Sequence, residues 1–296
     1  MLRHRIFVLM AFICAPALAQ EMEPRAYSPA PVGMNFVGLS WQNVSGGVTT
    51  DPTLPITDVD ADIDYALAGI SRTFAFAGRA ASVGLVVPYA WADVSGEVFE
   101  ASRSVSRRGL ADARLRLAWN LIGGPALDRA EFAARTPATT LGASLTVSTP
   151  TGEYDGDKLI NLGTNRWAFR PEVGLYHPLG PWSVEISAGV WLFTDNDDFL
   201  GGRRREQDPI TTVQGHVSYT VRPRLWVAVD GTWYRGGDTT VEGVRNEDLQ
   251  KTSRVGVTLS VPLVGEQSLK IAWSDGTATR IGADFTTWTV AWQNAW

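Results

Sequence analysis

Residues 111–121 read ADARLRLAWNL, and the two alternating sets of side chains in this stretch decide the fold class. The odd positions are all apolar and include Trp119 near the end of the stretch. The even positions carry Asp112, Arg114 and Arg116. Successive side chains of a β-strand point to opposite faces, whereas a helix would spread both sets around its circumference. The stretch therefore predicts a strand with one apolar face and one charged face.

The same alternation recurs along the chain and predicts twelve strands, each close to the length that a tilted strand needs to cross a bilayer. An even number of strands is what a single-chain bacterial barrel has when both termini lie in the periplasm. The predicted strands are residues 34–45, 62–74, 80–93, 110–121, 139–149, 165–177, 182–194, 210–222, 225–235, 252–263, 267–275 and 282–295.

The connections between these strands alternate in length. Those after odd-numbered strands are mostly long and polar: 46–61, 94–109, 150–164, 195–209, 236–251 and the shorter 276–281. Those after even-numbered strands are mostly tight: 75–79, 178–181, 223–224 and 264–266, with 122–138 as a longer exception that we expect to hold a short helix around Asp128 to Ala134. A soluble β-sandwich would also alternate, but its loops would not segregate by parity. The pattern predicts an all-β, transmembrane, antiparallel up-and-down β-barrel with short periplasmic turns and long outer loops.

The last predicted strand carries Trp288, Val290, Trp292 and Trp296 on one face, interrupted only by Asn294. A face with three tryptophans and no charge suits lipid, with tryptophan at the bilayer interfaces. The ending resembles the C-terminal signal by which bacterial outer-membrane barrels are recognised. We therefore expect Trp296 to be the assembly signal that the barrel-assembly machinery reads.

The first residues have the pattern of a secretory signal peptide. Arg3 and Arg5 precede an apolar stretch over residues 6–15, and the small-residue sequence at 17–19 offers a cleavage site. The apolar stretch is too short to cross a membrane as a helix. We expect a signal peptide over 1–19, a periplasmic N-terminal segment over 20–33 and a barrel over 34–296. Cys14, the only cysteine, would leave with the signal peptide, which excludes disulfides and cysteine metal sites.

Composition narrows the class of protein and its partners. No stretch after residue 20 reaches eighteen apolar residues, so no transmembrane helix is expected. Without Arg3 and Arg5 the chain has 24 basic and 31 acidic residues, a balance that disfavours nucleic-acid binding. The expected location is the outer membrane of a Gram-negative bacterium. The expected partners are outer-membrane lipids and lipopolysaccharide, the barrel-assembly machinery and a small-molecule solute, with no nucleic acid.

Charged side chains at even positions are predicted to face the lumen, because a charge facing lipid at mid-depth would cost about 2–4 kcal/mol. Two readings of these charges stay open: they pair across strands and fill a narrow barrel, or an acidic wall faces an arginine wall in a wet pore. The candidate lumen-lining residues are Asp58, Asp60, Asp62, Asp64, Arg114, Arg116, Arg166, Arg170, Glu172, Glu185, Trp191, His216 and Arg254.

Catalytic and cofactor readings find little support in the sequence. After the predicted signal peptide only His177 and His216 remain; neither is paired with an obvious serine, and no G-x-S-x-G motif is present. The chain is therefore predicted to be no enzyme and to need no cofactor. The acidic run at 195–198 offers oxygen ligands for a divalent cation, but it lacks the spacing and glycine of a calcium loop. A solvated loop, with Arg203 to Arg205 nearby, is the preferred reading.

Several motifs together resemble one outer-membrane family. They are residues 25–31, 150–154, 161–167, 191–199, 214–219 and 234–237, which read RAYSPAP, PTGEY, NLGTNRW, WLFTDNDDF, QGHVSY and YRGG. The chain is similar over about residues 25–296 to the outer-membrane transporter family named for the meta-pathway of phenol degradation. The resemblance implies a barrel and the passage of small, often aromatic or hydrophobic, compounds. It supplies no catalytic or binding residue that can be transferred.

Two functions follow as hypotheses. The first is a passive outer-membrane channel for small solutes, with inward aromatic residues such as Trp191, Trp226 and Tyr234 forming a stacking surface. The second is a plugged barrel with a structural or surface-interaction role. A continuous lumen would favour the channel, and an interior crossed by arginine–carboxylate bridges would favour the plugged barrel.

Overall fold

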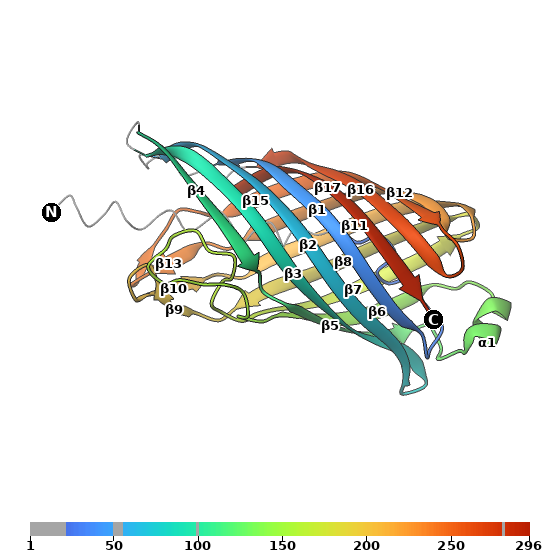
Figure 1. Ribbon diagram of the computed structural model, residues 1–296. Coiled ribbons are helices and arrows are strands. Elements are labelled where there is room, and N and C mark those ends of the chain that lie inside the picture. Colours follow the sequence, from blue (N-terminus) through green and yellow to red (C-terminus); the bar gives the residue numbers. More distant parts are fainter. Residues whose placement is uncertain (1–21, 50–55, 99–100, 280–281) are drawn as a thin grey trace.

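The computed structural model describes residues 22–49, 56–98, 101–279 and 282–296, and within them twelve antiparallel strands form a closed barrel (Figure 1). The barrel strands are β1 (Asn35–Thr49), β2 (Ile56–Phe76), β3 (Arg79–Val98), β5 (Arg114–Ile122), β6 (Thr140–Ser148), β7 (Ala168–Leu179), β8 (Trp182–Phe193), β11 (Ile210–Arg222), β12 (Leu225–Gly236), β15 (Gln250–Pro262), β16 (Gln267–Thr279) and β17 (Gly282–Ala295). The sheet closes because β1 pairs with β2 on one side and with β17 on the other. The predicted fold class and strand number are confirmed. The predicted signal peptide, with Arg3, Arg5 and Cys14, lies outside the described residues.

The two ends of the barrel differ, and we name them for their connections. The turn end holds the short turns, the C-terminus and helix α1 (Arg129–Ala134) (Figure 1). Asp128 and Glu131 cap this helix reciprocally, which confirms the helix expected in the 122–138 linker. The loop end holds a small second sheet of β9 (Asn196–Phe199), β10 (Arg203–Gln207), β13 (Thr239–Val241) and β14 (Val244–Arg245). These strands lie in stretches predicted as loops.

The wall extends farther at the loop end than the sequence predicted. β2 and β3 continue past the predicted strands 62–74 and 80–93, and β4 (Ala101–Leu110) pairs with β3 in a stretch predicted as a loop. The outward side of this extension is polar rather than apolar, so the sequence carries no signal of a lipid-facing strand there. The alternation rule therefore found the membrane strands but not their continuation into water.

Residues 111–113 interrupt the strand predicted over 110–121, so that β4 and β5 are separate. Ala111 and Asp112 are buried at 2% and 3% exposure, and the expectation that Ala111 faces lipid is wrong. Asp112 accepts hydrogen bonds from the backbone N–H groups of Gly152 and Thr164, each at 2.9 Å. A carboxylate that binds two backbone donors fixes the loop after β6 against this break.

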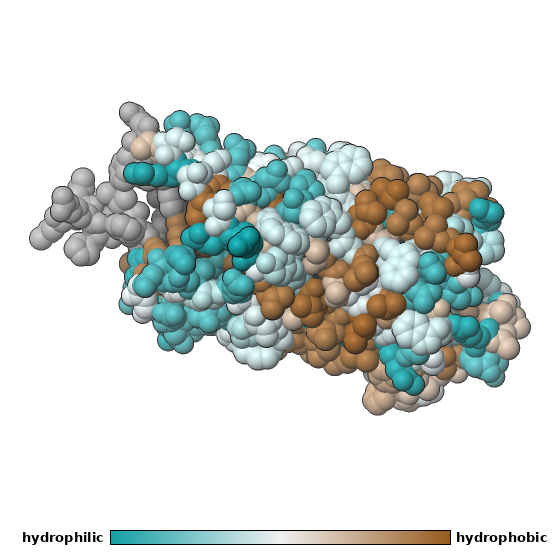
Figure 2. Space-filling view, viewed as in Figure 1, coloured by the Kyte–Doolittle hydropathy of each residue, from teal (hydrophilic) through white to brown (hydrophobic). Residues whose placement is uncertain are grey.

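The outward face of the barrel carries an apolar band over the part of the wall near the turn end (Figure 2). Leu115, Leu117, Ile70 and Val229 belong to it, with exposures of 36–61%. Trp288 and Trp296 are also exposed, as the final alternation predicted. A soluble protein would bury such a band, so the band is the surface suited to lipid. Among the described residues, no helix is long and apolar enough to cross a membrane.

Candidate functional site

Most of the predicted lumen-lining residues lie on the inward face of the barrel and are buried or half-buried there. Leu115 and Leu117, which alternate with Arg114 and Arg116, are exposed on the outward face instead. From Arg114 onward, the even positions therefore face inward and the odd positions face outward, as residues 111–121 predicted. The predicted residues that the structure places in the barrel interior are Arg114, Arg116, Arg170, Glu172, Glu185, Trp191, His216 and Arg254.

The four aspartates of β2 are a correction, because the inward positions beside them are Val59, Ala61, Ile63 and Tyr65. Asp58, Asp60 and Asp62 are exposed and Asp64 is half-buried on the outward face, which also carries Ile70 farther along the strand. On this face Asn43 Nδ2 donates to Asp62 Oδ1 at 2.9 Å and to Asp64 Oδ1 at 3.1 Å. Even positions of β2 face outward along the whole strand. They are mostly apolar within the lipid band and acidic beyond it, and the inward positions beyond the band are apolar.

An aromatic group marks the level of this inversion on the outward face. The rings of Trp41 and Trp91 lie 5.5 Å apart, and Tyr89 lies 4.7 Å from Trp91. Asp64 pairs with Trp91 in the strand register, so the first carboxylates follow directly after the aromatic rings. Tryptophan and tyrosine prefer the membrane–water interface, and carboxylates beyond it meet water. Outward aspartates are therefore compatible with a membrane barrel at this height.

The N-terminal segment, expected in the periplasm, lies inside the barrel, where Tyr27 is its anchor. The Tyr27 hydroxyl donates to Glu172 Oε1 and also contacts Ser144 Oγ, both at 2.9 Å. The Tyr27 backbone N–H donates to Glu185 Oε2 at 3.0 Å. The guanidinium of Arg116 lies 5.5 Å from the centre of the ring. Two carboxylates predicted as pore charges thus hold the segment across the lumen.

Two glycines make room for the Tyr27 ring. Gly142 and Gly174 are register partners on β6 and β7. A Cβ atom at these positions would lie 2.8 Å and 2.2 Å from ring atoms of Tyr27. Nearer the turn end, Arg25 donates to Thr220 Oγ1 at 2.6 Å, and its guanidinium lies 4.5 Å from the centre of the Trp226 ring. The segment is therefore fitted to the wall at two levels.

Other interior charges have partners within the wall. His216 Nδ1 lies 2.7 Å from Asp230 Oδ1, and Thr258 Oγ1 donates to the other oxygen of Asp230 at 2.8 Å. Arg254 donates to Ser274 Oγ and Thr287 Oγ1 at 2.9 and 3.0 Å. These contacts join strands between β11 and β17. None of them is an arginine–carboxylate bridge, the contact that the plugged-barrel hypothesis expected.

A cavity of about 260 Å³ remains between the N-terminal segment and the wall of β1, β2 and β15 to β17. Its charged lining includes Glu23, Arg254 and Lys270, and its apolar lining includes Val44, Leu67 and Phe285. The register sets Lys270 beside Ala291 of β17, and Phe285 lies six residues nearer the loop end. The cavity therefore has Lys270 toward the turn end and Phe285 toward the loop end, where Arg254 also lies and donates to Thr287.

Near Phe285 the cavity is continuous with a hydrophobic cluster, which we call the loop-end cluster. Its buried members are Val44, Val48, Val59, Ala61, Ile63, Tyr65, Ala90, Ala92, Val94, Ala111, Leu162 and Phe285. These side chains lie on the inward faces of the long strands, opposite the outward aspartates. Leu67 packs against the cluster and also lines the cavity. The barrel interior is thus apolar where the wall extends beyond the lipid band.

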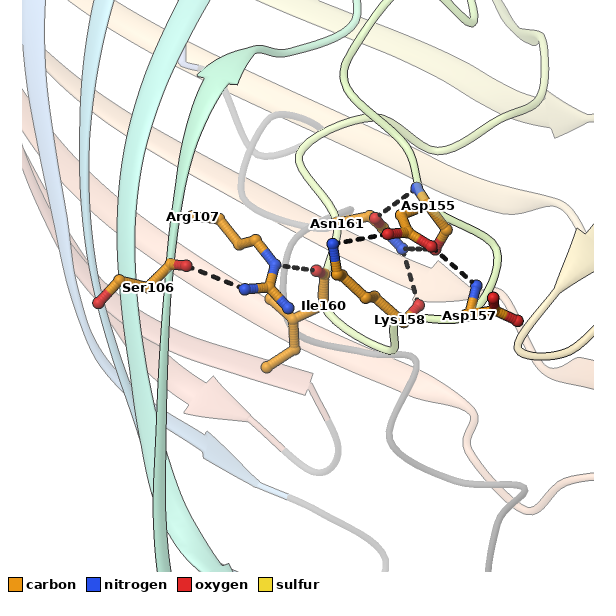
Figure 3. Close-up of polar contacts among 7 residues, drawn as sticks. All are labelled: Ser106, Arg107, Asp155, Asp157, Lys158, Ile160 and Asn161. Atoms are coloured by element: carbon orange, nitrogen blue, oxygen red, sulfur yellow. Dashed lines mark hydrogen bonds and ion pairs between the residues drawn. The ribbon is translucent and has the colours of Figure 1, made fainter.

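The loop after β6 covers this cluster with a compact turn (Figure 3). Asn161 Nδ2 donates to the carbonyl oxygens of Asp155 and Lys158, and Asn161 Oδ1 accepts from the Asp155 N–H at 2.9 Å. Arg107 of β4 donates through Nε to the Ile160 carbonyl at 3.1 Å. Ile160 itself packs against the loop-end cluster. One arginine therefore joins this covering loop to the wall.

Two arginines lie over aromatic rings on the inward side of β7 and β8. The guanidinium of Arg170 lies 5.2 Å from the Trp191 ring centre, and that of Arg166 lies 4.4 Å from Phe193. The rings of Trp191 and Phe193 are nearly parallel at 6.4 Å. Arg166, just before β7, also donates to Gln207. Burial, together with the charge of nearby Arg205, lowers the pKa of Arg166 to about 9.

The acidic run at 195–198 takes part in protein contacts. Arg204 pairs with Asp195 and lies 3.8 Å from Asp197, with all three side chains at least a third exposed. Such exposed pairs contribute little to stability. Asn196 is buried and donates to the Tyr154 hydroxyl at 2.8 Å. Within the described ranges, no group of three or more metal-ligating side chains is close enough to hold an ion.

Sequence reasoning missed the Tyr27 anchor, the loop-end cluster and Lys270. The cluster had a visible signal, since Val59, Ala61 and Ile63 alternate with the aspartates, but the charges were assigned to the lumen. Tyr27 had no such signal, because its partners Ser144, Glu172 and Glu185 lie more than 100 residues away.

Comparisons with known proteins agree with this architecture. A family model described as "Putative MetA-pathway of phenol degradation" matches residues 42–286. An outer-membrane channel from Pseudomonas putida F1 is similar in structure, with a TM-score of 0.79 and 21% identity, covering 93% of this chain and 100% of that one. The β domain of the Bordetella autotransporter BrkA gives a TM-score of 0.54 and 11% identity, covering 90% and 100%. No curated protein matches the sequence.

Proposed function

The chain belongs to the MetA-pathway family named for phenol degradation, and from that premise we propose that it is an outer-membrane channel for the passive passage of small solutes, hydrophobic and aromatic ones among them. Its fold is that of outer-membrane channels, which are not enzymes, and we assign it no catalytic activity. In this proposal the loop end faces outward, and the turn end, with the C-terminus, faces the periplasm. Lipids and lipopolysaccharide surround the barrel, and the barrel-assembly machinery inserts it.

The observation that carries the proposal is the interior cavity, which shares Val44, Leu67 and Phe285 with the loop-end cluster. A barrel that served only as a rigid wall would have no need of buried apolar surface beyond the lipid band. Such surface gives a hydrophobic solute a favourable path, at roughly 25 cal/mol per Å² of apolar area removed from water.

The contacts of Tyr27 favour the second candidate, a barrel that stays plugged and serves as a structural or surface protein. Tyr27 is held by Ser144, Glu172 and Glu185, and Arg25 by Thr220, so the N-terminal segment is fixed at several points. If this segment never moves, the lumen offers no path to solutes. The two functions differ in one measurable property, which is flux through the purified protein.

The test is a planar-bilayer recording together with uptake into proteoliposomes of a neutral aromatic solute such as phenol and of a sugar of similar size. We expect ion current and faster uptake of the aromatic solute. A variant with Tyr27→Ala serves to release the segment. Absence of current and of uptake in both proteins would establish the plugged barrel and refute the channel.

A further inference from the structure

Lys270 is a cation of the interior cavity for which no hydrogen-bond or ion-pair partner is found among the described residues. Lys270 lies on the inward face of β16 and lines the cavity. Among the described residues, no hydrogen bond or ion pair of its ammonium group is found. The cavity's other cation, Arg254, donates to the Ser274 and Thr287 hydroxyls. Lys270 is half-buried, so its ammonium group faces the cavity and is available to an anion that enters it.

Among the described residues, the acidic residues of the cavity make no direct contact with the Lys270 ammonium. Asp230 is engaged by His216 at 2.7 Å and by Thr258 at 2.8 Å. Glu23, on the N-terminal segment, lines the cavity and feels the positive charges of Arg116, Lys270 and Arg170. It makes no ion pair within 4 Å in the described part of the chain. Glu23 is thus a carboxylate that lies near several cations of the described residues and makes no ion pair with any of them.

The cavity lining also has an apolar part among its hydroxyl and amide side chains. Val44, Leu67 and Phe285 belong to this part, and all three belong to or pack against the loop-end cluster. A ligand that fills the cavity therefore meets the Lys270 ammonium and, elsewhere in the same cavity, the hydrocarbon of these three side chains, while Arg254 is held by Ser274 and Thr287. The volume of about 260 Å³ is close to the lower limit of roughly 300 Å³ for small-molecule pockets.

We propose that Lys270 and this cavity form a subsite for an amphipathic carboxylate: the carboxylate binds the Lys270 ammonium, and the hydrocarbon or aromatic part lies on Val44, Leu67 and Phe285. The inference rests on the proposed channel function and names one substrate class for it. Glu23 supplies the negative charge of the empty subsite and competes with the solute. A lysine–carboxylate contact is a charge-assisted hydrogen bond, stronger than one between neutral groups. A neutral solute of the same length lacks it.

The test uses the full-length mature protein in planar bilayers, with octanoate as the probe and octanamide as its uncharged counterpart. We expect octanoate to reduce the ion current at a roughly tenfold lower concentration than octanamide does. Lys270→Gln is expected to abolish this preference. Lys251→Gln, at an exposed position on the outward face of β15, is the matched control and is expected to keep it. Glu23→Gln is expected to strengthen the octanoate effect, because a competing anion is removed.

A second measurement needs no conduction: binding of labelled octanoate to the protein in nanodiscs, with the Lys270→Gln protein as the background for lipid partitioning. A conducting protein that treats octanoate and octanamide alike, or that keeps its preference in Lys270→Gln, overturns the subsite and leaves the channel function standing. If the protein carries no ion current but binds octanoate through Lys270, the subsite stands and the channel function is wrong. If it carries no current and shows no Lys270-dependent binding, both proposals are wrong.

Discussion

The ring of Tyr27 occupies the space that a side chain at position 174 would need: a Cβ atom built on Gly174 would lie 2.2 Å from the ring. Gly142, its register partner on β6, leaves space on the other side of the ring at 2.8 Å. The N-terminal segment is therefore seated in a slot of the barrel wall that two glycines create. This slot, together with the carboxylates of Glu172 and Glu185, sets how firmly the segment closes the lumen.

Removing the Tyr27 hydroxyl is expected to loosen the segment. Tyr27→Phe loses the contacts to Ser144 and Glu172, worth about 2 kcal/mol at roughly 1 kcal/mol each. That loss multiplies the population with a displaced segment by about thirtyfold. Single-channel recordings should show more frequent or longer open periods. Tyr219→Phe, on the exposed face, is the control and should leave the recordings unchanged; identical traces for all three proteins would show that Tyr27 does not gate the lumen.

Filling the glycine slot is expected to have the same effect by a different route. Gly174→Ala forces its Cβ against the Tyr27 ring and displaces the segment, while β7 retains its backbone pairing. Because both substitutions act on one contact, Gly174→Ala combined with Tyr27→Ala should conduct no better than Tyr27→Ala alone. Additive increases in conductance in the double variant would indicate that Gly174 acts elsewhere in the wall.

Asp62 and Tyr27 show which features of the structure the sequence predicts and which it does not. Alternation is a local property, so it gave the strands, their parity and the outward position of Leu115 correctly. It does not show where the wall leaves the lipid, so the prediction that Asp62 faces the lumen is wrong: Asp62 shares its parity with Ile70, and both lie on the outward face. The position of Tyr27 depends on contacts with strands more than 100 residues away, which no local period encodes.

Pore selectivity is expected to depend on inward arginines and not on the outward aspartates. Arg114→Gln combined with Arg116→Gln removes two interior positive charges and should shift ion selectivity toward cations. Asp60→Asn combined with Asp62→Asn removes two exposed charges, which salt at about 0.15 M screens over roughly 8 Å. Reversal potentials across a salt gradient give the comparison. A larger shift in the aspartate variant than in the arginine variant would contradict the observed sidedness.

Introducing a charge into the lipid band should impair the barrel. Leu115 is 36% exposed on the outward face, so Leu115→Arg is expected to cost about 2–4 kcal/mol near the bilayer midplane. Leu115→Met keeps the site apolar and serves as the control. The yield of folded barrel is read as the band that migrates faster on SDS gels without boiling. Equal folded yields of the two variants would remove position 115 from the lipid-facing surface.

Substitutions of Trp296 can separate its recognition by the assembly machinery from its effect on the stability of the barrel. The Trp296 backbone exchanges two hydrogen bonds with Asn35, at 2.9 and 3.0 Å, beside the seam between β1 and β17, while its side chain is 56% exposed. Trp296→Ala and Trp296→Phe both keep the backbone bonds, so both should refold in detergent like the parent protein. In cells, Trp296→Phe is expected to reach the outer membrane normally and Trp296→Ala to accumulate less, because only the latter lacks the terminal aromatic ring. Equal amounts of both variants in outer-membrane fractions would show that the assembly machinery does not read this side chain.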